Sequence, residues 1–300
     1  MEHLIYDQAS YNDHLSCIEA FLPIYEEAFP DANEREDWKD IQLRICDPNA
    51  FPKTILFFDN PLAPNGGLIA DIYPEQGVVH LIYIAVAQNK RGNGIAKRLI
   101  KEILPSCLAQ LQKQLICSFK AVLFESNIPW LTTKDAIDPK TRLQIFEYFG
   151  AKAIPIKYVQ PALHEAKKEV ENLFLLSFPL EGHLHQSIET SLLIEFLDAF
   201  YKGLGINEPK QNPFFKKMQA ELINITHMNQ VQLTAIPQQE RPQIRMKKAA
   251  ICMQFASKDE PGQAVASEIC NEFYSYEKDL LSAHFQKRRP FQSQFLDDFG

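Results

Sequence analysis

The segment from Val78 to Leu99 constrains the fold most, because it predicts a strand, a glycine-bearing turn and a helix in direct succession. Residues 81–86 are apolar and rich in β-branched side chains, which is typical of a buried central strand. A short polar turn ends this run. From Ile95 to Ile103 apolar residues return at helical spacing, so a helix is expected to begin directly after the turn.

The turn between the strand and the helix predicts a phosphate-binding site. Glycine at positions 92 and 94 lets the backbone come close to a ligand. The first N–H groups of a helix lack partners within it, and the helix dipole favours an anion there. Two other phosphate motifs are excluded, since Lys97 stands where GxGxxG requires its third glycine and GxxxxGK[ST] is absent.

Arg91, Gly94 and Ala96 give this turn the spacing Arg-x-x-Gly-x-Ala, after an apolar strand and at the start of a helix. In pattern and position the turn resembles the Gln/Arg-x-x-Gly-x-Gly/Ala loop of the GNAT superfamily of N-acetyltransferases, over about residues 1–180 of the chain. The resemblance implies that acetyl-CoA (coenzyme A) is the cosubstrate. An ordinary glycine-containing turn, or one that serves another nucleotide, is the alternative interpretation.

The resemblance also implies which residues hold the coenzyme. Backbone N–H groups at 92–96 would hold the pyrophosphate with added charge from residue 91, and the backbone of 84–86 would hold the pantetheine arm. Asn127 matches an asparagine that many family members use near that arm. The implied cofactor-binding residues are Ile84, Ala85, Val86, Arg91, Gly92, Asn93, Gly94, Ile95, Ala96 and Asn127.

The order of the predicted elements matches the first half of the acetyltransferase fold. We therefore expect an α/β (α+β) protein with a mixed, mostly antiparallel sheet flanked by helices, in a domain spanning residues 1–180. The expected strands are 3–8, 53–58, 67–73, 81–86, 120–125, 153–160 and 173–178. The expected helices begin at Asn12 or Asp13 with a kink or break at Pro23, at the capping box Asn33-x-x-Glu36, at Gly92 with a bend at Pro105, and at Asp138-Pro139 before Gly150.

Residues 181–300 are predicted to form an appended C-terminal α+β region, and the sequence does not indicate its role. A polar stretch at 182–186 separates it from the first domain. Helices are expected at 187–202 and 212–222 and within 264–285, and strands at 231–236 and 245–256.

Charge and composition limit the partners. The 300 residues carry a formal net charge of −7, which argues against general affinity for nucleic acid or an anionic membrane. The N-terminus is too polar for a signal peptide, and no apolar run reaches membrane-spanning length. Six cysteines without CxxC spacing indicate reduced thiols, so a cytoplasmic location is expected. His183 and His185 lack a third ligand, and no metal site is predicted.

Acyl transfer to an amine, which the resemblance implies, needs a group that removes a proton from the nitrogen. Glu125 is the predicted general base, because it ends an apolar strand beside the coenzyme strand, where burial would raise its pKa. A solvated or lysine-paired carboxylate at a strand end is the alternative interpretation. His80 is a second candidate base, with an ordinary hydrogen-bonded histidine as its alternative.

The general acid is where this sequence departs from the family pattern. Many members carry a tyrosine four residues before the glycine that ends the helix, and here Phe146 occupies that place. Tyr148 falls on a different face of the helix. Either the thiolate leaves unassisted or through water, or Tyr158 or Tyr83 serves, and we assign the catalytic role to Tyr158. Gln160 is placed to hydrogen-bond a substrate.

The sequence therefore predicts an acetyl-CoA-dependent N-acetyltransferase (acyltransferase) that moves an acetyl group to an amine of a small molecule or protein, by direct attack in a ternary complex. The alternative is a catalytically silent module that binds acyl-CoA and regulates or recruits a partner through the C-terminal region. Phe146 favours this alternative. Acidic residues near the first two helices could attract a cationic amine, although they also suit helix starts, and they are Glu26, Glu27, Glu34, Glu36 and Asp37.

Overall fold

The computed structural model describes residues 4–30, 35–132, 137–163, 168–180 and 185–237. The chain divides into two compact units, and all of the described residues belong to the first, Met1–Gln238. The strand expected at 245–256 and the helix expected within 264–285 lie outside the described residues. The domain boundary near residue 180 stays a prediction.

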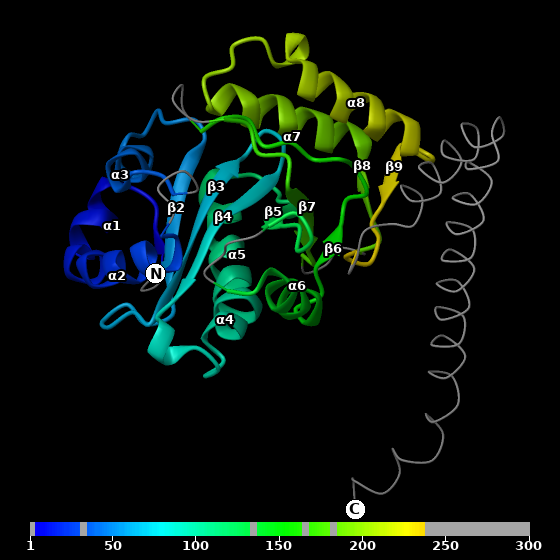
Figure 1. Ribbon diagram of the computed structural model, residues 1–300. Helices are drawn as coiled ribbons and strands as arrows, with labels where there is room; N and C mark the ends of the chain where they lie inside the picture. Colours follow the sequence, from blue (N-terminus) through cyan, green and yellow to red (C-terminus); the bar gives the residue numbers. More distant parts are fainter. Residues whose placement is uncertain (1–3, 31–34, 133–136, 164–167, 181–184, 238–300) are drawn as a thin grey trace, which may run out of the picture. The chain divides into compact units, whose positions relative to one another are not determined.

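A seven-stranded sheet forms the centre of the described part (Figure 1). Its strands are β1 (Leu4–Ile5), β2 (Lys53–Phe58), β3 (Gly66–Tyr73), β4 (Val78–Val86), β5 (Ala121–Asn127), β6 (Lys152–Ala153) and β7 (Leu173–Phe178). They lie in the order β1-β2-β3-β4-β5-β7-β6, in which β4 and β5 run parallel and the other neighbours antiparallel. This arrangement confirms the predicted mixed, mostly antiparallel sheet.

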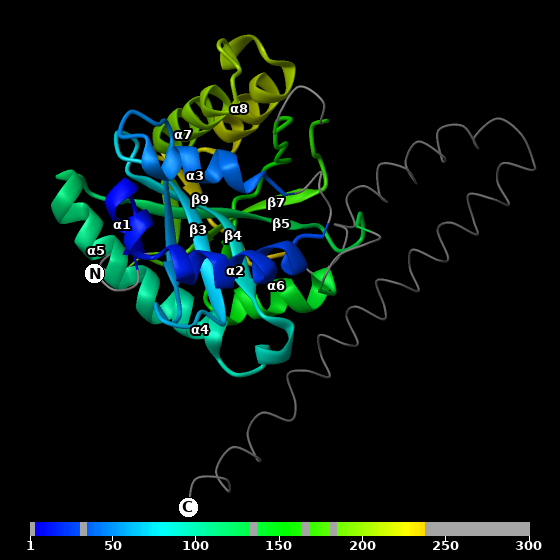
Figure 2. The same ribbon diagram turned by 90° about the vertical axis from the view of Figure 1, so that its left-hand side faces the viewer.

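Helices cover both faces of the sheet (Figures 1 and 2). The described helices are α1 (Gln8–Asp13), α2 (Leu15–Ala28), α3 (Trp38–Cys46), α4 (Ile95–Arg98), α5 (Leu104–Leu115), α6 (Pro139–Tyr148), α7 (Thr190–Gly203) and α8 (Pro213–Ile225). Apolar residues of α4, α5 and α6 share a core with one face of the sheet. On the other face α1, α2 and α3 pack against one end, and α7 and α8 against the other end. Within the described residues, every helix is too short or too polar to cross a membrane.

The described residues after 185 pack on the sheet. Two short strands, β8 (Ser187–Glu189) and β9 (Gln230–Gln232), pair with each other and flank the α7–α8 hairpin. Phe196 of α7 and Phe215 of α8 are fully buried in a core that also contains Leu123 of β5. This part of the appended region therefore shares a hydrophobic core with the sheet.

A bulge in β4 determines which layer of helices each side chain of this strand faces. Ala70 pairs with Leu81 and Ile69 pairs with Tyr83, so Ile82 has no opposite residue on β3. The bulge shifts the alternation of side chains by one residue. Consequently Leu81 and Ile84 both face the α4–α6 layer, whereas His80, before the bulge, contacts aromatic rings of α7.

The two central strands separate beyond this bulge. β4 and β5 pair from Val78 opposite Ala121 as far as Leu81 opposite Phe124. After these residues β5 continues to pair with β7 only, as far as Asn127. β5 therefore forms no ladder with the second half of β4.

The N-terminal elements differ from the predicted boundaries. The strand expected at 3–8 is shorter, because Asp7 caps α1 through its carboxylate. The first helix starts before Asn12, and His14 separates it from α2. Pro23 lies inside α2 and does not divide it.

The capping box predicted at Asn33 falls outside the described residues, and α3 begins later, at Trp38. Pro105 lies in the first turn of α5, behind a π-helical turn at Leu99–Ile103. A proline is tolerated in a first helical turn, since the missing N–H has no partner there. The helical path from Ile95 to Leu115 therefore continues through three segments.

Later predictions were also too long. The strand expected at 153–160 is reduced to β6 and an isolated bridge between Gln160 and Val170. The helix expected at 187–202 begins only at Thr190, since the three preceding residues form β8. The strand expected at 231–236 is β9, three residues long.

Candidate functional site

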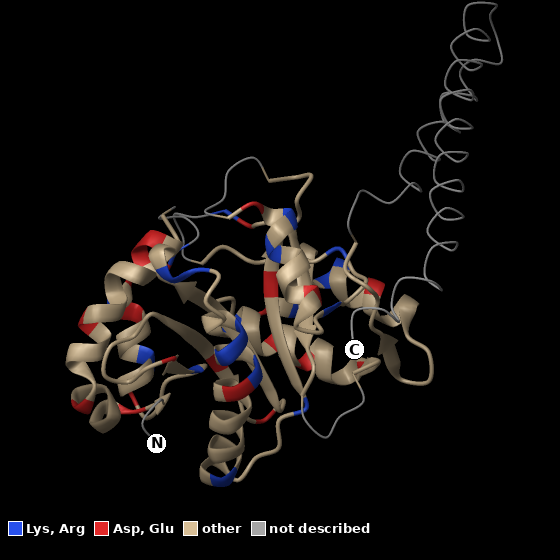
Figure 3. Cartoon of the chain, turned by 90° about the horizontal axis from the view of Figure 1, so that it is seen from below, with Lys and Arg blue, Asp and Glu red and all other residues tan. Residues whose placement is uncertain are grey.

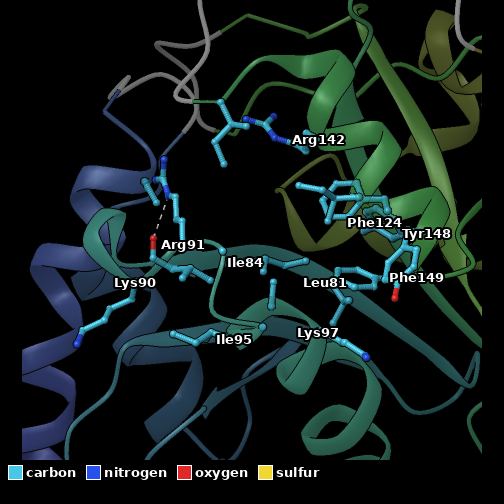
Figure 4. A pocket seen from close by; sticks show the side chains of 18 of the residues that line it. Leu81, Ile84, Lys90, Arg91, Ile95, Lys97, Phe124, Arg142, Tyr148 and Phe149 are labelled. Atoms are coloured by element: carbon cyan, nitrogen blue, oxygen red, sulfur yellow. Dashed lines mark hydrogen bonds between the residues drawn. The ribbon is translucent and has the colours of Figure 1, made fainter. Parts of the chain in front are cut away.

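A cavity of about 620 Å³ opens where β4 and β5 separate. The start of α4 and one side of α6 complete its walls. In Figure 4, Leu81 and Ile84 lie between Arg91 on one side and Phe124 and Phe149 on the other. The lining residues used below are Ile82, Ile84, Val86, Lys90, Arg91, Gly92, Gly94, Ile95, Ala96, Lys97, Phe124, Glu125, Arg142, Phe146 and Tyr148.

The turn at one end of the cavity has the geometry of an anion site. Gly92 and Gly94 have φ of 81° and 75°, a left-handed backbone that side chains disfavour. No atom lies within 4 Å of the place where either Cβ would stand, so the concave side of the turn is open. Gly94 is the N-cap of the helical path, and the N–H groups that follow it lack partners within the helix.

Cationic side chains surround this turn. Arg91 lines the cavity and donates a hydrogen bond from Nε to the carbonyl of Val86 at 3.3 Å, which fixes its stem (Figure 4). Lys90, Lys97 and Arg142 line the same cavity. These cations and the helix N-terminus favour a ligand with several negative charges.

Most of the residues implied for the coenzyme lie together. Seven of them line the cavity, namely Ile84, Val86, Arg91, Gly92, Gly94, Ile95 and Ala96. Three do not belong to its lining. Ala85 is buried against the α2 side of the sheet, Asn93 lies in the turn between the two glycines, and Asn127 is buried at the end of β5 opposite Leu173.

Sequence reasoning missed several lining residues. Arg142 comes from α6 and Phe124 from β5, whereas Lys97 was considered only as a missing glycine. Nothing in their local sequence indicates this role, because the packing of α6 beside β4 brings them to the cavity. A basic residue in the first turns of α6 was the available signal for Arg142.

Glu125 stands at the inner end of the cavity and is held by two side chains from the other face of the sheet. Its Oε2 lies 2.7 Å from Nε2 of His80, and its Oε1 accepts a hydrogen bond of 2.6 Å from the hydroxyl of Tyr158. The Glu125 side chain is 11 % exposed, whereas His80 and Tyr158 are fully buried. Of the three groups, Glu125 is the one that lines the cavity.

The protonation of this cluster differs from the expectation. Burial raises the pKa of Glu125, but the His80 charge and the hydrogen bonds from His80 and Tyr158 outweigh burial, so the pKa lies below its ordinary value. The predicted rise is therefore wrong in direction. Burial lowers the pKa of His80, yet the Glu125 charge outweighs burial and raises it. Burial and the neighbouring carboxylate raise the pKa of Tyr158 well above its ordinary value. Carboxylate and imidazolium are the favoured forms of the pair.

A second polar cluster lies on the same face as His80. Arg44 of α3 binds Glu36 at 2.7 Å and reaches Thr54 of β2 at 2.8 Å, and Thr54 donates to Asp71 of β3 at 2.6 Å. Burial raises the pKa of Asp71 to about 6, although the Arg44 charge acts in the opposite direction. The side of the sheet opposite the cavity therefore carries buried charges, whereas the cavity floor is apolar.

The other aromatic candidates lie apart from Glu125. Phe146 lines the cavity and packs against the rings of Phe124 and Phe178 at centroid distances of 5.0 and 5.8 Å. Tyr148 lines the outer part of the cavity and is 74 % exposed. Tyr83 packs between Tyr25 and Phe29 on the α2 side, and its hydroxyl accepts a hydrogen bond from the N–H of Glu36.

Acidic residues are frequent on the helices nearest the N-terminus, as Figure 3 shows. Glu36 faces Arg44, and Glu26 and Glu27 lie at the end of α2. Asp37 is the N-cap residue of α3, and Glu34 lies outside the described residues.

The histidines proposed as poor metal candidates show no metal geometry in the described part. His185 binds the carbonyl of Ser177 through Nε2 at 3.0 Å, and His183 lies outside the described residues. Among the described residues no group of three or more His, Cys, Asp and Glu side chains could hold a metal ion. Cys17, Cys46, Cys107 and Cys117 are free thiols.

The comparisons with known proteins agree with this geometry. Residues 16–120 match the model of the acetyltransferase (GNAT) family. The matched segment contains β4, the glycine turn and the helical path that follows. No curated protein matches the chain.

Several solved structures are similar to this chain at low identity. A protein described as an acetyltransferase of the GNAT family from Bacteroides thetaiotaomicron has 17 % identity and a TM-score of 0.41, covering 58 % of this chain and 84 % of its own. The catalytic domain of Tetrahymena GCN5 histone acetyltransferase, in complex with coenzyme A, has 14 % identity and a TM-score of 0.33, with coverages of 56 % and 87 %. The ribosomal-protein-S18-alanine N-acetyltransferase of Escherichia coli has 12 % identity and a TM-score of 0.36, with coverages of 56 % and 94 %.

Proposed function

We propose that this protein is an acetyl-CoA-dependent N-acetyltransferase that acts on an amine of a small molecule or of a protein. One observation carries the proposal. A single cavity has an open glycine turn with cations at one end and a hydrogen-bonded carboxylate, Glu125, at the other. Such a cavity fits a long ligand whose anionic end and reactive end lie far apart.

The residues around the glycine turn fit the anionic end of coenzyme A, its pyrophosphate. We assign the pyrophosphate to the backbone N–H groups around Gly94 and to Arg91. Lys97 lines the same cavity and would bind a further phosphate oxygen. The backbone of β4 from Ile84 to Val86 would bind the amides of the pantetheine arm, because β5 does not pair with it there; the carbonyl of Val86 already accepts from Arg91.

At the reactive end, acetyl-CoA would supply a thioester whose carbonyl carbon the amine attacks. We assign Glu125 as the general base, because its favoured form is the carboxylate and it faces the cavity. His80 would hold the carboxylate from behind and stabilise its charge. The hydroxyl of Tyr158 is also bound to Glu125, so we assign Tyr158 a positioning role at this site.

Phe146 cannot give a proton to the departing thiolate. We propose that the proton taken by Glu125 from the nitrogen passes to the sulfur directly or through water. The carboxylate would then be restored without any other protein acid. This accounts for a phenylalanine in the cavity wall at the place where the family pattern has a tyrosine.

We further propose that the appended region shapes the acceptor side of the site. The ring of Phe196 lies 5.4 Å and the ring of Phe200 lies 5.0 Å from the ring of His80. Helix α7 therefore covers the face of the sheet from which His80 contacts Glu125. An acceptor could then approach from the α2 and α3 side. The cytoplasmic location and the absence of nucleic-acid and membrane partners stay predictions from charge and composition.

The test uses the full chain. We expect coenzyme A, among a panel of nucleotides, to raise the melting temperature, and acetyl-CoA to release free thiol in the presence of a suitable amine. Binding of coenzyme A without thiol release across a broad amine panel would support the silent module instead. A rise in melting temperature with other nucleotides but not with coenzyme A would refute the assignment of the cavity.

A further inference from the structure

A second, much smaller cavity of about 30 Å³ lies on the side of His80 that faces away from Glu125's carboxylate. Its polar lining comes from α3, β3 and β4, from the segment before α3 and from the segment after β6. Phe200 and Leu204 close it from the α7 side. The polar lining residues are Glu36, Arg44, Asp71, Tyr73, His80 and Gln160.

Three of these residues have a buried polar atom without a hydrogen-bond partner among the described residues. The atoms are Nη2 of Arg44, the hydroxyl oxygen of Tyr73 and Nδ1 of His80. Tyr73 and His80 are fully buried. Buried polar atoms normally find a partner, and three in one small cavity indicate a ligand atom that binds to all of them. The space is enough for about two water-sized groups.

We propose that this cavity binds an uncharged oxygen, a carbonyl or a hydroxyl, of the molecule whose amine is acetylated. The proposal rests on the proposed function for the identity of that molecule. It names a substrate class: amines that carry a neutral oxygen close to the reacting nitrogen, such as amino amides and amino alcohols.

The charges around the cavity exclude the other ligand types. Arg44 donates through its guanidinium, and Nδ1 of His80 donates when the ring is protonated, the form that the neighbouring carboxylate of Glu125 stabilises. A cation would face both of these positive groups. An anion would face the carboxylates of Glu36 and Asp71, which together with Glu125 outnumber the two cations. A neutral oxygen accepts from the donors without either conflict.

The position of the cavity links it to the reaction. Ile82, at the bulge of β4, is in the lining of both the small cavity and the coenzyme cavity. His80 presents Nε2 to Glu125 and Nδ1 to the small cavity. The proposed molecule would place its oxygen beside Nδ1 of His80 and its nitrogen beside Glu125, on the Nε2 side of the ring.

The first test is binding without coenzyme A. We would label the eight histidines of the full chain with ¹⁵N, assign His80 by its loss in His80→Gln, and titrate acetamide, acetate and ethylammonium. We expect acetamide to shift the His80 Nδ1 resonance saturably, more strongly than the other two probes. Tyr73→Phe should weaken acetamide binding about fivefold. Tyr11→Phe, which removes a hydroxyl outside the cavity, should leave it unchanged.

Saturable binding of ethylammonium or acetate in preference to acetamide would overturn the proposal, and so would the absence of any shift, which would mean that the cavity holds only water. The second test compares thiol release with glycinamide and with propylamine. We expect Tyr73→Phe to lower kcat/KM about fivefold for glycinamide and not for propylamine. An equal loss for both amines would overturn the assignment of the oxygen. Acetamide binding at His80 without any thiol release would refute the proposed function and leave the oxygen site standing.

Discussion

The two faces of strand β4 carry side chains of different chemistry. On the cavity face the floor is apolar, and the charged groups that line the cavity are the cations Lys90, Arg91, Lys97 and Arg142 and the carboxylate of Glu125. On the opposite face His80 and Asp71 are buried titratable groups and Arg44 is a partly buried cation, with α3 and α7 beside them. Glu125 lies where the faces meet, because β4 and β5 have separated there.

This difference suits each face of β4 to a separate function. The cavity face has the apolar surface and the cations that would hold a long anionic ligand, and Glu125 is the carboxylate among the described residues that line the cavity. The opposite face has the hydrogen bonds that set the protonation of Glu125. Substitutions in the turn should therefore change affinity, whereas substitutions behind Glu125 should change the rate and its pH dependence.

The largest expected effect belongs to Glu125→Gln. Loss of the carboxylate removes the proposed base, so kcat should fall about 10²- to 10⁴-fold, while the affinity for coenzyme A stays within a factor of about two. Thiol release and calorimetric titration measure the two quantities. Glu195→Gln, on the exposed side of α7, is the matched control and should have wild-type activity. A fully active Glu125→Gln enzyme would remove Glu125 as the base.

Gly94→Asp tests the binding of coenzyme A at the glycine turn. The substituted residue must adopt a left-handed φ, and its carboxylate would stand beside bound phosphates, so coenzyme A should bind about 100-fold more weakly. Gly205→Asp is the matched control, because Gly205 also has a positive φ, 84°, with open space around it, outside the cavity. Equal affinity in Gly94→Asp and wild type would contradict the phosphate assignment.

The contrast between the faces also explains which features the sequence revealed. The turn from Arg91 to Ala96 is one continuous stretch, and its glycines and helix start fix its geometry locally. Glu125 was recognised from its place at the end of an apolar strand. The lowered pKa of Glu125 could not be recognised in the sequence, because this shift depends on His80 and Tyr158, which lie 45 and 33 residues away.

The register of the sheet creates these contacts. His80 pairs opposite Leu123, which places the next residue on the same face of β5, Glu125, beside it. Tyr158 reaches the carboxylate from a segment predicted as a strand that has no continuous ladder. The bulge at Ile82 had no sequence signal, and without it the alternation of β4 predicts the wrong face for every later residue.

His80→Gln should change stability in a pH-dependent way. The raised pKa of His80 means that its contribution is complete below about pH 6.5 and is lost as the pH rises through the folded-state pKa. The lowered pKa of Glu125 means that its contribution is complete above its ordinary pKa and is lost as the pH falls. The variant should therefore be less stable by about 2 kcal/mol near pH 6, with a smaller difference at alkaline pH. Urea unfolding from pH 5 to 9 measures this.

The exposed residue His227 offers the control for that experiment, since His227→Gln should leave the curve unchanged. A difference between His80→Gln and wild type that stays constant from pH 5 to 9 would show that the pair is not ionised. In that case the charges assigned to the face behind Glu125 would be wrong. The two faces of β4 would then differ only in how their side chains pack.

Tyr158→Phe has the smallest expected effect and sharpens the comparison most. Its hydroxyl donates to Glu125, so its loss should cost about 1.5 kcal/mol of stability and should raise the pKa of the carboxylate, because a group that stabilises the charged form is removed. The acidic limb of the kcat/KM profile should move to higher pH, while the rate near pH 8 stays close to that of wild type. Tyr201→Phe removes another buried hydroxyl, which donates to the carbonyl of Val159, and should cost stability without moving the limb. A loss of rate in Tyr158→Phe that is the same at every pH would instead assign Tyr158 to proton transfer itself, because a positioning group changes the acidity of Glu125 and a proton donor does not depend on it.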